Sequence, residues 1–217
     1  MSTTAMSNIV NSGVIACLRA QSADVALEAA RAAIQAGISV LEIVVSTPGV
    51  FQVLHQLAQE FPTTTLGVGT VLNLKDAQNA KNAGANFIMS PAFLKDILDE
   101  DLLYIPGVMT PTEILSSYNA GAKIVKVYPV SAIGGVQYIA TLKKPFPHIP
   151  MVASQGITTD LVGAYIDEGA SAVVLSDAIF DKKAISQRNF TAIYQLARFA
   201  ALQGHEAVKR KEKIYPS

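Results

Sequence analysis

The amino-acid sequence predicts an α/β fold: a single-domain (β/α)8 barrel over residues 1–217, with extra helical segments at the N- and C-terminal ends. Two observations favour this architecture. Short apolar segments alternate eight times with segments of helical pattern, and a glycine recurs where a helix would give way to a strand. Half of the residues are hydrophobic, which is enough to bury a large core and argues against disorder.

The strands are expected where short runs rich in Val, Ile and Leu occur, a composition typical of parallel strands covered on both faces. In chain order these runs are 14–18, 40–45, 66–72, 87–90, 103–109, 124–130, 151–153 and 172–175. A segment that fits a helix follows each run, at 22–35, 50–60, 75–82, 95–98, 111–119, 136–142, 159–167 and 187–202. The helical pattern is weakest at 95–98 and 136–142.

Four glycines support this order because each falls between an expected helix and the next strand. They occur in the pairs Ala36-Gly37, Ala83-Gly84, Ala120-Gly121 and Glu168-Gly169. Glycine suits the left-handed conformation that commonly ends a helix. The main alternative is a Rossmann-like open sheet, but segment 67–70 lacks the third glycine of a dinucleotide-binding loop. No linker rich in Gly and Ser divides the chain, so we expect one domain.

Charge and composition argue against several classes of partner. The chain has 17 basic and 17 acidic residues, so no basic excess points to nucleic acid or to an anionic membrane. The apolar runs are too short to span a membrane, and the N-terminus lacks the pattern of a signal peptide. The single cysteine, Cys17, cannot form an intrachain disulfide. We expect a cytoplasmic protein in which Cys17 is a small buried hydrophobic residue.

Two charged residues lie inside expected strands, where burial of a charge is costly. Glu42 lies in the motif Leu-Glu-Ile-Val-Val, and Lys126 lies in Ile-Val-Lys-Val-Tyr-Pro. They belong to the second and sixth strands, and inward residues of even-numbered strands can share one layer of a barrel. The sequence therefore predicts a carboxylate and an amine in one small apolar chamber.

This pair of residues suggests covalent chemistry. Burial disfavours the charged form of lysine and lowers its pKa, so that a neutral amine of Lys126 can attack a ketone and form an imine. Glu42 can then move protons during dehydration and carbon–carbon cleavage. The alternative is a buried structural ion pair, which the spacing alone leaves open.

Two further residues end strands of the predicted barrel. Thr70 ends the third strand, where its hydroxyl either orients a substrate or satisfies nearby backbone groups. Pro91 ends the fourth strand, where its ring fixes the turn out of the barrel and shapes the wall.

Several motifs occur in an order that resembles the 2-keto-3-deoxy-6-phosphogluconate / 4-hydroxy-2-oxoglutarate (KDPG/KHG) aldolase family. They are Leu-Glu-Ile (41–43), Gly-Val-Gly-Thr-Val-Leu (67–72), Ala-Gly-Ala-Asn-Phe-Ile-Met-Ser-Pro (83–91), Ile-Pro-Gly-Val-Met-Thr-Pro-Thr-Glu (105–113) and Val-Lys-Val-Tyr-Pro (125–129). Each motif is weak alone, but the ordered set covers most of the chain and is specific.

The resemblance implies roles for individual residues. It implies that Lys126 forms a Schiff base with pyruvate, that Glu42 is the general acid/base, and that Thr70, Pro91 and Tyr128 contact substrate. It also implies a homotrimer, a small 2-keto acid as substrate, and neither a metal nor a cofactor.

The chain departs from the family pattern at two places. Some members carry an arginine after the second-strand glutamate, where this chain has Ser46, and others carry one at the end of the first strand, which Arg19 matches. We therefore expect Arg19 to bind a carboxylate or phosphate.

The second departure is at the expected phosphate site. Family members are expected to have Thr-Gly-Gly after the seventh strand and a glycine-serine pair after the eighth. This chain has Ser154-Gln155-Gly156 and Leu175-Ser176-Asp177 there. Ser154, Gly156 and Ser176 remain candidate substrate-binding residues, but we expect the preference for phosphate to be weakened or changed.

Together these features predict a class I aldolase that cleaves KDPG, or a related 4-hydroxy-2-keto acid, to pyruvate and an aldehyde such as glyceraldehyde 3-phosphate or glyoxylate. Two alternatives stay open at this point. One is a decarboxylase or other lyase acting on a 2-keto acid, and the other is a catalytically idle barrel that binds a small acid or a partner protein.

Overall fold

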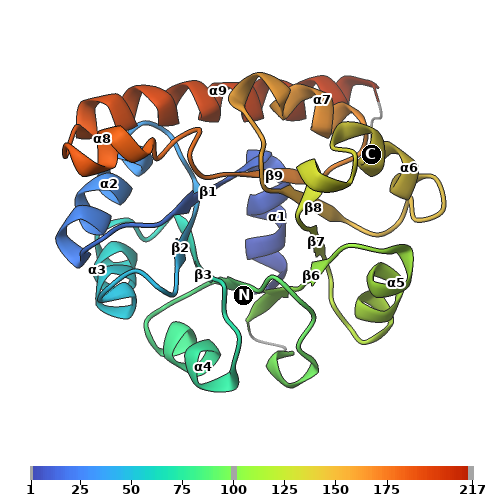
Figure 1. The fold of residues 1–217 in the computed structure, drawn as a ribbon, viewed down its shortest axis with the longest axis horizontal. Coiled ribbons are helices and arrows are strands. Elements are labelled where there is room, and N and C mark those ends of the chain that lie inside the picture. Colours follow the sequence, from blue (N-terminus) through green and yellow to red (C-terminus); the bar gives the residue numbers. More distant parts are fainter. Residues whose placement is uncertain (1, 99–101, 215–217) are drawn as a thin grey trace.

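A nearly closed barrel of parallel strands, with helices around it, forms the body of the molecule (Figure 1). The computed structural model describes residues 2–98 and 102–214, and nine strands lie in this part of the chain. The strands are β1 (Val14–Leu18), β2 (Val40–Val44), β3 (Thr65–Gly69), β4 (Phe87–Met89), β5 (Leu103–Ile105), β6 (Gly107–Val108), β7 (Val125–Val127), β8 (Met151–Ser154) and β9 (Ala172–Leu175). The predicted (β/α)8 barrel is confirmed.

The structure corrects one detail of that prediction, because the fifth expected strand is divided at Pro106. The sheet order is β5-β4-β3-β2-β1-β9-β8-β7-β6, so the two ends of the sheet are consecutive pieces of chain. Proline has no N–H to donate to a ladder, and the strand is interrupted there. The Pro106 carbonyl nevertheless accepts a hydrogen bond from the Lys126 N–H at 2.8 Å, which helps to close the barrel beside β7.

The helices cover the outside of the barrel and one of its ends. Within the described ranges the α-helices are α1 (Ser2–Ser12), α2 (Ala23–Gln35), α3 (Val50–Glu60), α4 (Leu74–Asn82), α5 (Pro111–Asn119), α6 (Val136–Lys143), α7 (Val162–Asp167), α8 (Lys182–Ser186) and α9 (Phe190–Ile214). Short 3₁₀ turns are η1 (Lys95–Ile97), η2 (Val130–Ile133) and η3 (Thr159–Leu161). No helix of residues 2–98 and 102–214 is long and apolar enough to cross a membrane.

Local sequence signals explain where several helices begin and end. Thr110 and Glu113 form a capping box at the start of α5, with Pro111 in the first turn. At the other ends, the four recurring glycines all adopt the predicted left-handed conformation, with φ between 97° and 112°. That prediction is confirmed.

The C-terminal helical region differs from its expected extent of residues 187–202. It begins earlier, with α8, and α9 continues to Ile214. The apolar pattern fades after residue 202, but Gly204 lets α9 pack closely on the start of β1: an added Cβ there would lie 2.6 Å from the Ser12 carbonyl oxygen. This close packing is one of the contacts that hold the extended part of α9, and Arg210 and Lys211 further along bind Asp167 and the Ala170 carbonyl.

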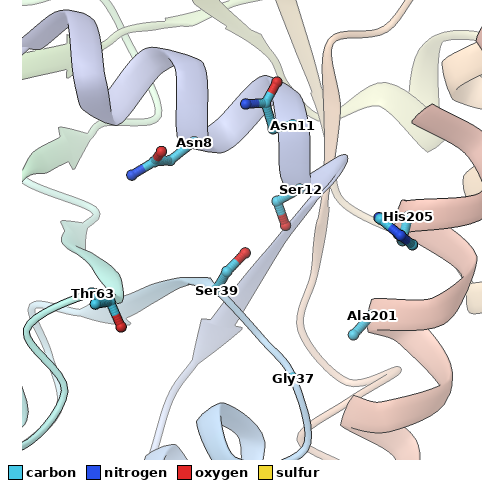
Figure 2. Close-up of a pocket in the computed structure, with 8 residues that line it drawn as sticks. All are labelled: Asn8, Asn11, Ser12, Gly37, Ser39, Thr63, Ala201 and His205. Atoms are coloured by element: carbon cyan, nitrogen blue, oxygen red, sulfur yellow. The ribbon is translucent and has the colours of Figure 1, made fainter. Parts of the chain in front are cut away.

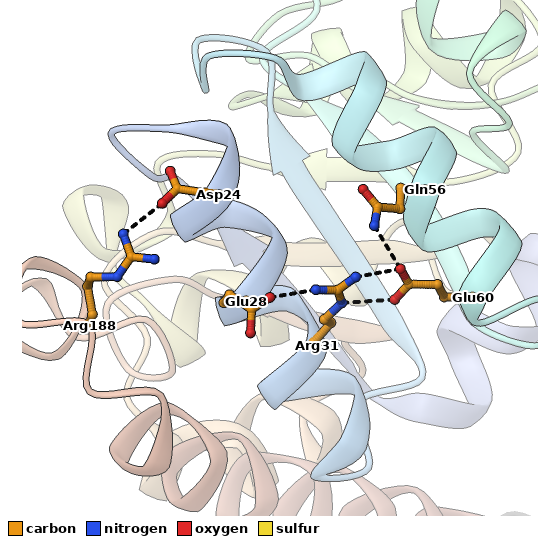
Figure 3. A network of polar contacts seen from close by, with 6 residues as sticks. All are labelled: Asp24, Glu28, Arg31, Gln56, Glu60 and Arg188. Carbon is orange, nitrogen blue, oxygen red and sulfur yellow. Dashed lines mark hydrogen bonds and ion pairs between the residues drawn. The ribbon is translucent and has the colours of Figure 1, made fainter.

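Ion pairs join the outer helices on one side of the barrel (Figure 3). Arg31 of α2 contacts Glu28 of the same helix and donates from Nε to Glu60 of α3 at 2.9 Å. Asp24 at the start of α2 pairs with Arg188, which lies between α8 and α9, at 2.7 Å. These pairs are open to solvent on the surface of the helices, so screening keeps their contribution to stability small.

The core has two parts, one between the strands and helices and one inside the barrel. The inner part includes Ala5 and Ile9 of α1, so this helix closes the amino end of the barrel with apolar side chains. Phe87 is fully buried there, and a Cβ on Gly67 would lie 2.5 Å from its ring. Gly67 therefore provides the space that the Phe87 ring needs.

Candidate active site

A cavity of about 590 Å³ lies at the carboxyl ends of the strands. This is the end at which barrel enzymes place their catalytic residues. The predicted site residues that line it are Arg19, Glu42, Thr70, Lys126, Tyr128, Ser154, Gly156 and Ser176. The structure thus brings together side chains from both halves of the sequence in one cavity.

Lys126 and Glu42 face this cavity from β7 and β2 and are almost completely buried. The exposed fraction is 6% for Lys126 and 3% for Glu42. Burial lowers the pKa of the Lys126 amine, while the neighbouring charge of Glu42 acts in the opposite direction. Burial likewise raises the pKa of the Glu42 carboxyl, against the opposing effect of Lys126. Both groups are therefore shifted towards their neutral forms.

Tyr128 contributes an aromatic ring beside the amine. The Lys126 Nζ lies 5.2 Å from the centroid of this ring, within the range of a cation–π contact. Tyr128 is 37% exposed, so its ring forms part of the opening rather than the floor. The alternation of side chains along β7 directs both residues to the same face.

Gly69 determines whether the Glu42 carboxylate fits in the cavity. A Cβ at Gly69 would lie 1.4 Å from the carboxylate oxygen Oε1 of Glu42, so any side chain at this position would clash with Glu42. The two glycines of β3 therefore have separate functions: Gly67 accommodates the Phe87 ring and Gly69 accommodates Glu42.

Two non-glycine residues at the edge of the cavity have left-handed backbones. Thr70 has φ of 60° and Gln155 has φ of 88°. This conformation is unfavourable for a β-branched threonine in particular. Such strain persists where the surroundings impose it and often accompanies functional sites.

Cys17 is a cavity residue that the sequence did not indicate as part of the site. It was expected to be only a small buried hydrophobic residue, but it lines the cavity together with Glu42 and Lys126. Cys17 is the register partner of Glu42 in the neighbouring strand, and its thiol acts to lower the pKa of that carboxyl, against the larger effect of burial. Burial raises the pKa of the thiol well above its ordinary value, so it stays protonated. The position of Arg19, two residues after Cys17 and directly after the end of β1, was the available signal, because alternate residues share a face.

Pro91 is placed differently from the other predicted residues, since it is not among those that line the cavity. Its backbone packs against Gly107, where an added Cβ would lie 2.2 Å from the Pro91 carbonyl carbon. This position fits the expected shaping of the wall, and a contact of Pro91 with substrate stays a prediction.

The loops that follow β8 and β9 form the distal part of the cavity. Ser154, Gln155 and Gly156 follow β8, and the Gln155 side-chain oxygen accepts a hydrogen bond from the hydroxyl of Ser131. After β9, Asp177 forms an ion pair with Lys182 at 3.2 Å.

Comparison with known proteins agrees with this geometry. The family model described as KDPG and KHG aldolase matches residues 6–196. A 2-dehydro-3-deoxy-phosphogluconate aldolase of Pseudoalteromonas atlantica is 34% identical over 137 residues, which cover 61% of this chain and 64% of that enzyme, slightly under two thirds of its length. The KHG/KDPG aldolase of Escherichia coli is 26% identical over 202 residues, which cover 91% of this chain and 95% of that enzyme.

A solved structure is also similar over almost its full length. The KDPG aldolase of Legionella pneumophila, with pyruvate captured as a covalent carbinolamine intermediate, superimposes with a TM-score of 0.82 at 26% identity. The match covers 89% of this chain and 96% of that one. From the extent of the family match, we conclude that this chain belongs to the KDPG and KHG aldolase family.

Proposed function

We propose that this protein is a class I aldolase that cleaves KDPG or a related 4-hydroxy-2-keto acid through a Schiff base on Lys126. The observation that carries the proposal is the nearly complete burial of Lys126 in the same cavity as Glu42, at the carboxyl end of the barrel. Burial favours the neutral amine, which is the nucleophile that imine formation requires.

The reaction begins when the Lys126 nitrogen attacks the ketone carbon of the substrate. The resulting carbinolamine loses water to give a protonated imine. The bond between the third and fourth carbons then breaks, its electron pair moving towards the imine nitrogen, as the hydroxyl on the fourth carbon gives its proton to Glu42. The products of this step are an aldehyde and an enamine of pyruvate on Lys126. Protonation of the enamine and addition of water release pyruvate and restore the amine.

The other lining residues support binding in this proposal. Arg19 is exposed at the opening and has the charge and donors to hold the carboxylate of the 2-keto acid. Thr70 and Tyr128 border the reacting atoms. Ser154, Gly156 and Ser176 offer hydrogen bonds to the aldehyde portion of the substrate.

Borohydride trapping with pyruvate tests the Schiff base directly. We expect a reduced pyruvate adduct on the peptide that contains Lys126, and none in Lys126→Ala. Lys143→Ala is a matched control, because burial lowers the pKa of Lys143 to about 8, yet its amine donates to the carbonyls of Pro147 and Ile149 outside the cavity. A folded protein that forms no adduct would overturn the proposed mechanism.

Product analysis separates cleavage from the decarboxylase alternative. An aldolase releases one aldehyde for each pyruvate, whereas a decarboxylase acting through the same lysine releases carbon dioxide.

We further propose that the protein is cytoplasmic and that it is a homotrimer, the oligomeric state that the family resemblance implies. Large apolar side chains are available on the surface for subunit contacts, and Leu72, Leu74, Phe199 and Leu202 are all about half exposed or more. Light scattering should give about three times the chain mass of 23.0 kDa, and a monomer would contradict the proposal.

A further inference from the structure

We infer that the distal end of the cavity selects the uncharged, hydroxylated end of an unphosphorylated 4-hydroxy-2-keto sugar acid and rejects a phosphate. The inference rests on the proposed function and specifies its substrate class. It concerns the loops after β8 and β9, the position where barrel enzymes usually bind phosphate through backbone N–H groups.

In the loop after β8, a protein side chain occupies the approach that a phosphate would use. Gly156 has a left-handed backbone, and a Cβ there would lie 2.4 Å from Oγ and 2.6 Å from Cβ of Ser131. Glycine at such a place normally lets a ligand come close to the backbone. Here it is Ser131 that comes close, and its hydroxyl is bound to the side chain of Gln155.

In the loop after β9, a carboxylate lines the cavity. Asp177 is 68% exposed and its partner Lys182 is 85% exposed. An ion pair so open to solvent is weak and screened, so it neutralises the Asp177 charge only in part. A phosphate dianion in this part of the cavity would meet the repulsion of a like charge.

The charges around the cavity fit a neutral distal group. Among the described lining residues, the charged ones are Arg19 and Lys126 on one side and Glu42 and Asp177 on the other. Lys126 and Glu42 act at the reacting carbons, and Arg19 serves the keto-acid carboxylate. No cation of the described lining is then left for a phosphate.

The groups that remain match hydroxyls well. Hydrogen bonds can be donated and accepted by each of the side chains of Ser154, Gln155 and Ser176. The Asp177 carboxylate only accepts them. A sugar hydroxyl donates and accepts, so it can satisfy this set without bringing a charge.

The test compares kcat/KM for 2-keto-3-deoxygluconate with kcat/KM for its 6-phosphate. We expect the unphosphorylated acid to be preferred by at least about tenfold, equivalent to roughly 1.4 kcal/mol. Asp177→Asn should shift this ratio about tenfold towards the phosphorylated acid. Gln155→Gly, which removes the partner of Ser131 and relieves the left-handed strain, should shift it in the same direction.

Asp167→Asn is the matched control. Asp167 is also an exposed carboxylate in an ion pair, with Arg210 at 2.9 Å, but it ends α7 at the opposite end of the barrel. This variant should leave the ratio unchanged. A preference for the phosphorylated acid, or a ratio that Asp177→Asn does not move, would overturn the inference.

Pyruvate trapping keeps this result separate from the proposed function. If the pyruvate adduct forms on Lys126 but only the phosphorylated acid or neither acid is cleaved, the inference fails and the Schiff-base chemistry stands. If no adduct forms, the proposed function fails and the inference fails with it.

Discussion

The two ends of the barrel interior are built from the same strands but from different chemistry. Towards the amino end, the inward residues are apolar, and towards the carboxyl end, the next inward residue of several strands is polar. The successive inward pairs are Ile15 and Cys17, Val40 and Glu42, Ile124 and Lys126, and Val152 and Ser154. A step of two residues along a strand thus separates a side chain that stabilises the fold from one that faces the cavity.

The outer surface at the amino end also differs from the catalytic end. A hollow of about 300 Å³ lies there between α1, α9 and the loops before β2 and β3 (Figure 2). Its lining includes Ala201 and the polar side chains of Asn8, Asn11, Ser39, Thr63 and His205. Glu42 and Lys126 at the other end are buried ionisable groups, which generally reduce stability. Substitutions at the catalytic end should therefore lower activity, whereas substitutions at the apolar end should lower stability.

Lys126→Met should give the largest effect on activity. The methionine retains most of the volume of lysine but has no nucleophile, so we expect kcat/KM to fall by at least about 10⁴-fold. The free energy of unfolding, measured in urea, should stay the same or increase, because a buried ionisable group is replaced by an apolar one. A marked loss of stability would break the proposed contrast between the two ends.

Phe87→Ala tests the apolar end. Phe87 is fully buried inside the barrel, so its truncation should lower the free energy of unfolding by about 3–5 kcal/mol. The folded fraction should retain most of its kcat. Leu115→Ala, on a side chain that is 43% exposed on α5, is the control and should change stability by about 0.5 kcal/mol or less.

The two glycines of β3 place the same contrast within one strand, because Gly69 faces Glu42 and Gly67 faces Phe87. In Gly69→Ala the new methyl overlaps the Glu42 carboxylate, and misplacement of this group by about 1 Å should lower kcat about 10²-fold. In Gly67→Ala the methyl meets the Phe87 ring, and overpacking should instead lower the free energy of unfolding by about 1–3 kcal/mol. If both variants lose only stability, the functional division of β3 is wrong.

Cys17→Val should give the smallest effect, a shift of the acidic limb of the pH–rate profile. The neighbouring Cys17 thiol lowers the pKa of Glu42 and so opposes the effect of burial. Its removal should raise that pKa further, so the carboxylate that accepts the substrate proton is lost at a higher pH. We expect the acidic limb of kcat/KM to move up by less than about one pH unit. Cys17→Ser keeps a donor and should move it less, and a downward shift in Cys17→Val would exclude this role.

The sequence was most informative where one simple rule acted. Alternation along a strand placed Lys126 and Glu42 in the barrel, and the glycines at helix ends marked the entries to alternate strands. The same rule, applied from Arg19, would have placed Cys17 in the site. Free cysteine is so often an ordinary core residue, however, that the residue type favoured a place in the core. These features depend on local geometry, which sequence patterns record well.

Features that depend on contacts between distant segments could not be predicted. Nothing in the sequence indicates that Ser131 occupies the space above Gly156, because the two lie on separate βα units. The extended part of α9 likewise depends on contacts with distant segments, among them the close approach of Gly204 to the start of β1. Pro106 stands within an apolar run, so an interruption there could have been suspected from the sequence. Whether the run forms one strand or two depends on how the whole sheet closes.

The pairing of β1 with β9 has a consequence for synthesis on the ribosome. Val14 is the register partner of Val173, so the first strand acquires its second neighbour only when the last strand has been made. Until then, one edge of β1 has unpaired N–H and C=O groups, and such an edge invites pairing with other chains. Because closure joins residues so far apart in sequence, the barrel should fold slowly for its size, and the nascent chain is most exposed to aggregation just before residues 172–175 emerge.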